Sequence, residues 1–145
     1  MKTDTCLFCR IVSGELPATI VYEDDRSVAF LDHRPLFPGH TLLVPREHVE
    51  TLGELPAENV GPYFEAAQLL SLAVETAMEA EGTFVAMNNR VSQSVPHLHV
   101  HVVPRRRKDG LKGFFWPRTK YKSDEEMEEV KKKIANALKK IKIKK

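Results

Sequence analysis

Three histidines separated by single apolar residues are the most chemically suggestive feature of the chain. His97, His99 and His101 lie in a run bounded by Pro96 and Pro104. Successive side chains of a β-strand point to opposite faces, so a strand here would place the imidazoles on one face, about 7 Å apart. Leu98, Val100 and Val102 would share the other face and belong in the core. Clustered imidazoles repel one another when more than one is protonated, so a cluster of three indicates a functional role. Three interpretations remain open: a metal site, a histidine nucleophile supported by its neighbours, and a polar strand without chemistry.

Cys6 and Cys9 are the only cysteines and form a C-x-x-C motif. A disulfide between them would close a tiny loop and stabilise little. The remaining alternatives are half of a zinc site and a redox pair. A thioredoxin-type pair follows a strand and opens a helix, whereas only five residues precede Cys6. The spacing therefore favours zinc, with further ligands from elsewhere in the chain.

Short strands and two helices are expected to position these residues. Strands are predicted where β-branched and apolar runs stand between turn residues, at 19–23, 27–31, 41–44, 84–87 and 98–103. A helical turn is predicted over 8–13 and a long helix over 56–80, where apolar residues, Phe64 among them, recur every three or four positions and form one face to be buried in the core. A second helix over 123–141 begins with the S-x-x-E capping box of Ser123 and Glu126. Strands and helices do not alternate strictly, which predicts an α+β fold with a mostly antiparallel sheet.

Composition and charge indicate an ordinary globular domain. A chain of 145 residues can bury its own core, and no apolar run approaches the roughly 18 residues of a membrane span. The polar first residues lack a signal-peptide pattern, so a cytoplasmic location is expected. The net charge of +2 is uneven, because residues 131–145 hold eight lysines and no acid, which leaves −6 for the rest. Nucleic acid is therefore not an expected partner, and the tail is interpreted as a solvated helix end.

Taken together, the motifs resemble those of the histidine-triad (HIT) family. Residues 97–103 match the signature H-φ-H-φ-H-φ-φ, where φ is apolar, at every position. Residues 32–45 are similar to a second family segment, and residues 6–11 and 93–95 also fit, in the order that the family has them. The resemblance covers roughly residues 6–117. Within the family, the chain resembles the zinc-containing bacterial-type branch.

The resemblance implies both a fold and an activity. The fold would be a twisted antiparallel sheet of about five strands with one long helix packed on it, a short N-terminal helix and a C-terminal helix. Residues 1–122 would form the HIT-like domain, and residues 123–145, an amphipathic helix with a basic tail, would be part of the same unit. Family members commonly form homodimers, bind purine nucleotides, and hydrolyse or transfer nucleotidyl groups at the α-phosphate. Dinucleoside polyphosphates and nucleoside phosphoramidates are the substrate classes that this implies.

By the same resemblance, His99 is the nucleophile. A neutral imidazole can attack phosphorus at neutral pH and form a nucleotidyl-histidine that water then cleaves. An acceptor must hold the other ring nitrogen so that the attacking nitrogen keeps its lone pair. His101 would serve as hydrogen-bond or proton donor to the phosphate or the leaving group. Gln93 and Ser94 would contact the same groups.

The resemblance also implies a nucleotide site and a metal site. The nucleotide would be bound by Phe8, Ile11, Phe30, Asp32 and Asn88, with the Asp32 carboxylate accepting from the ribose hydroxyls. Zinc would be bound by Cys6, Cys9, His48 and His97. Four such ligands make a closed structural site that activates no water. The remaining histidines, His33 and His40, have no role at this stage.

The chain departs from the family pattern at two places, and one alternative function remains open. Ser92 stands where many members have glycine, so the backbone is expected to avoid positive φ or to adjust. The basic segment 105–118 could hold a polyphosphate chain, with Trp116 stacking on a base, or could be a loop packed on a second subunit. The rival function is a non-catalytic, zinc-stabilised nucleotide- or nucleic-acid-binding module. Such a module needs no nucleophile at His99.

Overall fold

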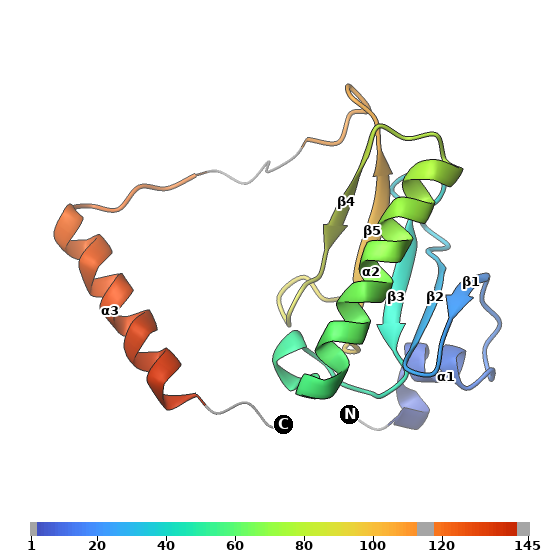
Figure 1. Ribbon diagram of the computed structural model, residues 1–145, viewed down its shortest axis with the longest axis horizontal. Helices are drawn as coiled ribbons and strands as arrows, with labels where there is room; N and C mark the ends of the chain where they lie inside the picture. The colour runs from blue at the N-terminus through green and yellow to red at the C-terminus, as the bar shows by residue number, and fades with distance from the viewer. Residues whose placement is uncertain (1–2, 113–117, 142–145) are drawn as a thin grey trace. The chain divides into compact units, whose positions relative to one another are not determined.

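A computed structural model describes residues 3–112 and 118–141 (Figure 1). Residues up to Asp109 form one unit, and residues from Gly110 to Lys144 form a second. The expectation that residues 123–145 are part of the same unit as the HIT-like domain stays a prediction, and Trp116 lies outside the described residues.

The first unit is built on a five-stranded antiparallel sheet, which confirms the predicted α+β class. In spatial order the strands are β1 (Ile20–Glu23), β2 (Ser27–Leu31), β3 (Thr41–Pro45), β5 (Val100–Arg105) and β4 (Gly82–Ala86). All neighbouring strands are antiparallel. β5 lies between β3 and β4, although it comes last in the chain. The strand that carries the end of the histidine motif is therefore held by hydrogen bonds on both sides.

Helices cover the sheet on two sides. The helix α2 (Ala57–Ala77) crosses one face, over β3, β5 and β4 (Figure 1). The short helix α1 (Leu7–Val12) packs on the other face. Two 3-10 turns, η1 (Thr3–Thr5) and η2 (Leu52–Glu54), precede α1 and α2.

Alternation along the strands divides the core between the two faces. The buried residues under α2 include Ala29, Leu43, Val100 and Val102. Those on the α1 side include Val28, Phe30, Leu42 and Val44. His101 is the cross-strand partner of Leu42 and so belongs to the α1 side. The apolar half of the histidine motif thus anchors it in the core, as predicted.

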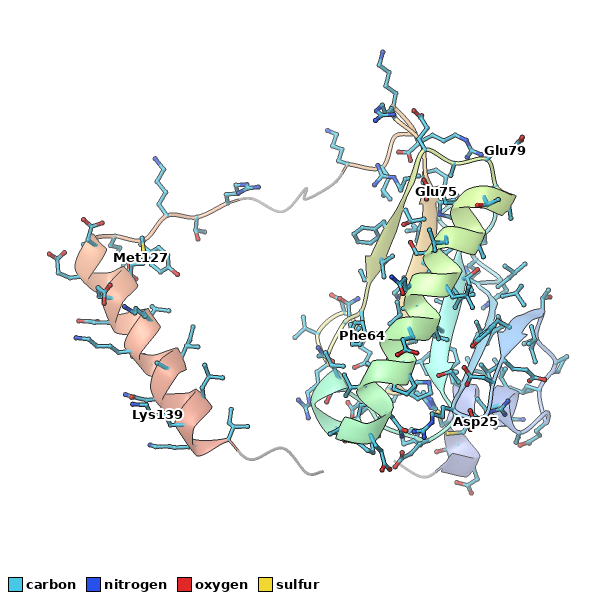
Figure 2. The ribbon with its side chains drawn as sticks, viewed as in Figure 1. Asp25, Phe64, Glu75, Glu79, Met127 and Lys139 are labelled. Atoms are coloured by element: carbon cyan, nitrogen blue, oxygen red, sulfur yellow. The ribbon has the colours of Figure 1, made fainter. Side chains whose placement is uncertain are left out.

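α2 is shorter than predicted and buries a somewhat different stripe. Its buried side chains are Tyr63, Ala66, Ala67, Leu70 and Val74. Phe64, expected in the core, is 43% exposed (Figure 2). Pro62 lies inside the helix, where it offers no amide to the carbonyl four residues back. The guanidinium of Arg26 donates to that carbonyl, of Glu58, at 3.4 Å, which helps the helix to tolerate the proline.

β5 begins at Val100, two residues later than predicted. His97 and His99 lie in the segment before it, because the backbone there bonds elsewhere than in the sheet. The amide of Leu98 donates to the carbonyl of Val49 (2.7 Å). The His97 carbonyl lies 2.8 Å from Nδ1 of His99. The histidine side chains therefore come from a strand and its lead-in, which lets His97 point to a different site.

The second unit contains the helix α3 (Asp124–Lys140). Its predicted start is confirmed, because Ser123 Oγ accepts from the amide of Glu126 at 3.1 Å. The Glu126 carboxylate returns to the amide of Lys122 rather than to that of Ser123. Among the described residues, no helix combines the length and the apolar character needed to cross a bilayer.

Candidate functional site

A cavity of about 670 Å³ opens on the α1 side of the sheet. This is a typical size for a small-molecule site. Of the residues predicted to bind or react with a nucleotide, seven line it: Phe8, Ile11, Phe30, Asp32, Ser94, His99 and His101. They come from α1, the end of β2, and the start of β5 with its lead-in. The sheet order brings together segments that are far apart in the chain.

His99 is the most deeply set of the polar groups in this cavity, at 4% exposed. Its Nδ1 lies 2.8 Å from the carbonyl oxygen of His97. A carbonyl can only accept, so Nδ1 carries the ring proton of the neutral imidazole. The lone pair is then on Nε2. This is the acceptor arrangement that a histidine nucleophile requires.

His101 is oriented by His40, a histidine for which no role was predicted. His40 Nε2 lies 2.9 Å from His101 Nδ1, and the amide of Leu36 donates to His40 Nδ1 at 3.1 Å. A neutral His40 must then carry its proton on Nε2 and donate it to His101 Nδ1. That leaves the proton of a neutral His101 on its own Nε2. The chain of bonds makes His101 a hydrogen-bond donor through Nε2.

Burial keeps this pair uncharged. The pKa of His101 is lowered to about 4, chiefly by desolvation and then by repulsion from His99 and His40, while Asp32 opposes the shift. Desolvation also lowers the pKa of His40, and Asp32 again opposes it, 3.8 Å away. Both imidazoles are therefore neutral at pH 7. The proton positions inferred above depend on that neutrality.

Aromatic rings form one wall of the cavity. The centroids of Phe8 and Phe30 are 5.4 Å apart, edge to face, and the ring of Phe8 stands 5.1 Å from that of His99. Ile11 packs in the same cluster. These side chains belong to the core and also line the cavity, so a place in the core is compatible with contact to a base. Asp32, at the end of β2, accepts from the amide of Arg34 through one oxygen (2.9 Å).

Gln93 and Asn88 are not among the residues that line the cavity; they brace the loop before the histidine motif. Gln93 accepts from the amide of Arg90 and donates to the carbonyl of Glu50, both at 2.7 Å. Asn88 donates to the carbonyl of Ser92 at 3.1 Å. Ser92 itself adopts a φ of 62°. The loop thus keeps a left-handed backbone although it has a side chain where many members have glycine.

A second cluster joins the four residues expected to bind metal: Cys6, Cys9, His48 and His97. His97 Nδ1 lies 3.4 Å from Cys6 Sγ, 3.5 Å from Cys9 Sγ and 3.2 Å from His48 Nδ1. Cys9 Sγ lies 3.2 Å from His48 Nδ1. Ligands of a tetrahedral zinc ion with ordinary Zn–S and Zn–N bonds are separated by roughly 3.3–3.8 Å. The donor set fits such an ion in number, chemistry and spacing.

The surroundings of His97 support the same use. Its Nε2 lies 2.8 Å from the carbonyl of Pro45, so the ring proton belongs on Nε2 and Nδ1 is available as a ligand. Desolvation lowers the pKa of His97 to about 4. Burial, followed by the bond to Cys6 and its charge, raises the pKa of Cys9 to about 11. Without a cation the thiol would keep its proton, so metal binding here is coupled to proton release.

The arginines of the basic run at the end of β5 are engaged by groups of the same unit. Arg105 Nε lies 2.6 Å from Asp109, and Arg107 Nη1 lies 2.5 Å from Glu81. Arg106 donates to the carbonyl of Met78. These side chains lie at the end of β5 away from His101, and none of them lines the cavity. For these three arginines, the geometry therefore does not support the interpretation as a polyphosphate channel.

Two histidines of the site, His33 and His40, were not predicted from the sequence. His33 is exposed and lines the cavity, and buried His40 orients His101. The available signal was the Gly39–His40 step before β3. Gly39 has a φ of 100°, and a β-carbon there would lie 2.6 Å from the Met78 side chain, so the turn that delivers His40 requires glycine.

Comparison with known proteins places the chain in a family. Residues 13–108 match the HIT domain. An uncharacterized HIT-like protein of Saccharolobus solfataricus is 44% identical over 140 residues, 94% of this chain and 99% of that protein. The adenosine 5'-monophosphoramidase of Schizosaccharomyces pombe is 36% identical, over 78% of this chain and 84% of its own length. An adenylylsulfatase of Arabidopsis thaliana is also 36% identical, over 73% of this chain and 55% of its own length.

Solved structures agree with this. A HIT family protein of Bacillus subtilis has a TM-score of 0.83 and 33% identity, over 91% of this chain and 96% of its own. A zinc-bound histidine triad protein of Mycobacterium smegmatis has a TM-score of 0.72 and 33% identity, over 94% of this chain and 99% of its own. The match of most of the chain to the domain model, with relatives above 30% identity, means that this protein belongs to the HIT domain family.

Proposed function

We propose that the protein is a nucleotide hydrolase or nucleotidyl transferase that uses His99 as a covalent nucleophile. The observation that carries the proposal is the bond between His99 Nδ1 and the His97 carbonyl. It leaves the lone pair on Nε2 of a histidine that lines the cavity. The base would lie against Phe8, Ile11 and Phe30, and the ribose hydroxyls would reach Oδ2 of Asp32, since the amide of Arg34 donates to Oδ1.

The reaction proceeds in two displacements. The Nε2 lone pair of His99 attacks the α-phosphorus, so that a P–N bond forms and the bond to the leaving group breaks. Sulfate departs as the anion with the electrons of that bond, whereas an amine takes up a proton from water as it departs. Water then attacks the phosphorus and gives up a proton to solvent, while the P–N bond breaks and returns its electron pair to Nε2, which releases the nucleotide and free His99. With inorganic phosphate as second acceptor, the same site would carry out phosphorolysis.

His101 would assist by donating a hydrogen bond from Nε2 to the phosphate or the leaving atom. It is neutral at pH 7, so complete loss of that proton would leave an unfavourable imidazolate. Of the two roles expected from the sequence, hydrogen-bond donor fits this geometry better than proton donor. Ser94, at the cavity wall, offers its hydroxyl to the same phosphate.

For the substrate we favour an adenylyl group joined through a single phosphate to nitrogen or sulfate. Two relatives are named for such activities, on adenosine 5'-monophosphoramidate and adenylyl sulfate. Dinucleoside polyphosphates remain a second class. They have less support because the basic run that could hold extra phosphates is engaged with Glu81, Asp109 and the Met78 carbonyl.

We further propose that zinc is a structural cofactor, held by Cys6, Cys9, His48 and His97 in the manner of the bacterial-type branch. When bound, the ion would tie α1 to the segment before β5. All four positions around it would be filled by protein, so it would activate no water. A cytoplasmic location suits unpaired thiols and stays a prediction.

A homodimer is also part of the proposal. β4 is an edge strand of the sheet, and beside it Phe64, Leu72 and Val85 are exposed around a shallow apolar groove. Exposed apolar surface next to an unpaired strand edge suits the burial of that face against a second copy.

The decisive test compares wild type with His99→Ala. We expect turnover of adenosine phosphoramidate and adenylyl sulfate to fall by about a thousandfold or more, while AMP binding is retained. Rapid acid quenching followed by mass spectrometry should find adenylate on His99 of the wild type. His33→Ala is the control, since His33 lines the cavity without touching phosphorus in this scheme. Turnover by His99→Ala would refute the covalent mechanism, and a wild type that binds AMP but converts neither substrate would favour the binding module.

A further inference from the structure

Within the second unit, the helix α3 presents an apolar stripe on its surface. Met127, Ile134, Leu138 and Ile141 are 48%, 58%, 68% and 62% exposed, and none of the residues of α3 is buried. Together with Val130 they follow one line along the helix, within a band about 80° wide at 3.6 residues per turn. A stripe of this width is typical of a helix that packs against one partner.

The spacing of the residues in this stripe is symmetric about its centre. From Met127 to Ile141 the steps are three, four, four and three residues, centred on Ile134. A second copy of the helix running the opposite way would therefore present the same pattern at the same heights. Ile134 would face its own counterpart, and Met127 would lie level with the partner's Ile141.

The charges select that direction. Residues 124–129 contain five acids, whereas residues 131–140 contain five lysines and no acid. Figure 2 shows Met127 and Lys139 toward opposite ends of α3. A parallel pair would set acid against acid and lysine against lysine. An antiparallel pair brings Glu128 and Glu129 level with Lys139 and Lys140 of the other copy.

We propose that α3 pairs in antiparallel fashion with the α3 of a second copy of this chain, across a two-fold axis at Ile134. Apolar burial supplies the attraction, and the charges set the orientation, because exposed ion pairs add little stability but penalise the wrong alignment. One pair of 17-residue helices associates weakly. It would gain from any other contact between the two copies, which raises the effective concentration of the helices. The proposal does not depend on the enzymatic function.

Disulfide trapping in the full-length chain tests the pairing. Under mild oxidation, Ile134→Cys should form a covalent dimer at least about tenfold faster than Asn136→Cys, which is the matched control on the opposite side of the helix. Met127→Cys alone should not form a homodimer, since antiparallel copies hold these positions about 21 Å apart. A mixture of Met127→Cys and Ile141→Cys chains should form the mixed dimer. Wild type reports the background from Cys6 and Cys9, and circular dichroism verifies the helix.

Charge exchange tests the orientation. In the Ile134→Cys background, Glu128→Lys with Glu129→Lys should reduce trapping, and adding Lys139→Glu with Lys140→Glu should restore it. Trapping of Met127→Cys with itself would indicate a parallel pair and overturn the proposal. So would equal trapping at 134 and 136. Binding of the wild type to phosphatidylserine vesicles without any trapping at 134 would assign the stripe to a lipid surface instead.

Discussion

His40 Nε2 lies 2.9 Å from His101 Nδ1, although 61 residues separate the two histidines in the chain. The amide of Leu36 occupies the other nitrogen of His40. The proton of His40 is thereby directed to His101, and the proton of His101 is directed away from His40. His40 is a positioning residue under the proposed function, because it acts on the reacting atoms only through His101.

Replacements of His40 should therefore distinguish the loss of its hydrogen bond to His101 from the loss of its packing. His40→Leu removes the donor to His101, and we expect kcat to fall about tenfold or more with little change in KM. His40→Gln can place an amide N–H near the former Nε2 and should retain more of the activity. His33→Gln is the control in the same cavity. Equal losses in both His40 variants, in proportion to a lowered Tm, would reduce His40 to a packing role.

Metal analysis should find one zinc ion per chain in protein purified without added metal. Cys9→Ser should lose the ion and lower Tm more than it weakens AMP binding, because a closed site contributes to folding. Ser13→Ala, just after the same helix, should retain zinc and most of the Tm. An anomalous zinc signal away from Cys6, Cys9, His48 and His97, or no zinc at all, would contradict the assignment.

Acid should destabilise the protein through His101. Its pKa is about 4 in the folded state and near 6.5 when unfolded, so below pH 6.5 the unfolded chain binds a proton that the folded chain excludes. The free energy of unfolding should thus be unaffected by this group above pH 6.5 and should decline as pH falls from 6.5 towards 4. His101→Gln should show a shallower decline in denaturant titrations across this window. The same slope in the variant would show that His101 does not cause the decline.

The basic run should matter little for substrate recognition. Because Arg107 is paired with Glu81, and Arg106 donates to the Met78 carbonyl, Arg106→Ala with Arg107→Ala should leave KM within about twofold for both a phosphoramidate and a dinucleoside tetraphosphate. A rise in KM for the tetraphosphate alone, shrinking at high salt, would revive a role in holding polyphosphate.

Local patterns accounted for much of what could be predicted. The alternation at 97–103 identified Leu98, Val100 and Val102 as core, and they are fully buried. The capping box at Ser123 identified the start of α3, and the strands at 27–31 and 41–44 were found within one residue. These features depend on side-chain periodicity and on neighbours within one turn, which are properties of the sequence itself.

Other features depended on which segments the fold brings together. Phe64 was predicted in the core and is exposed, because the position of α2 on the sheet selects which of its apolar side chains are covered. The basic run resembled an anion site until β4 and β5 placed Glu81 beside Arg107. The partner of a charge is not a local property.

The sequence by itself determined the kinds of group available for chemistry: two thiols three positions apart, and imidazoles set two apart along a strand with its lead-in. The tertiary structure decided which atoms of those groups are usable. The pairing of β3 with β5 brings the Pro45 carbonyl to His97 and the His40 ring to His101, and the break before β5 turns the His97 carbonyl to His99. Each partner occupies one ring nitrogen and leaves the other for metal, hydrogen bonding or attack. Either ring nitrogen of a neutral histidine can carry the proton until a neighbouring group binds one of them. Here most of those neighbours come from across the sheet.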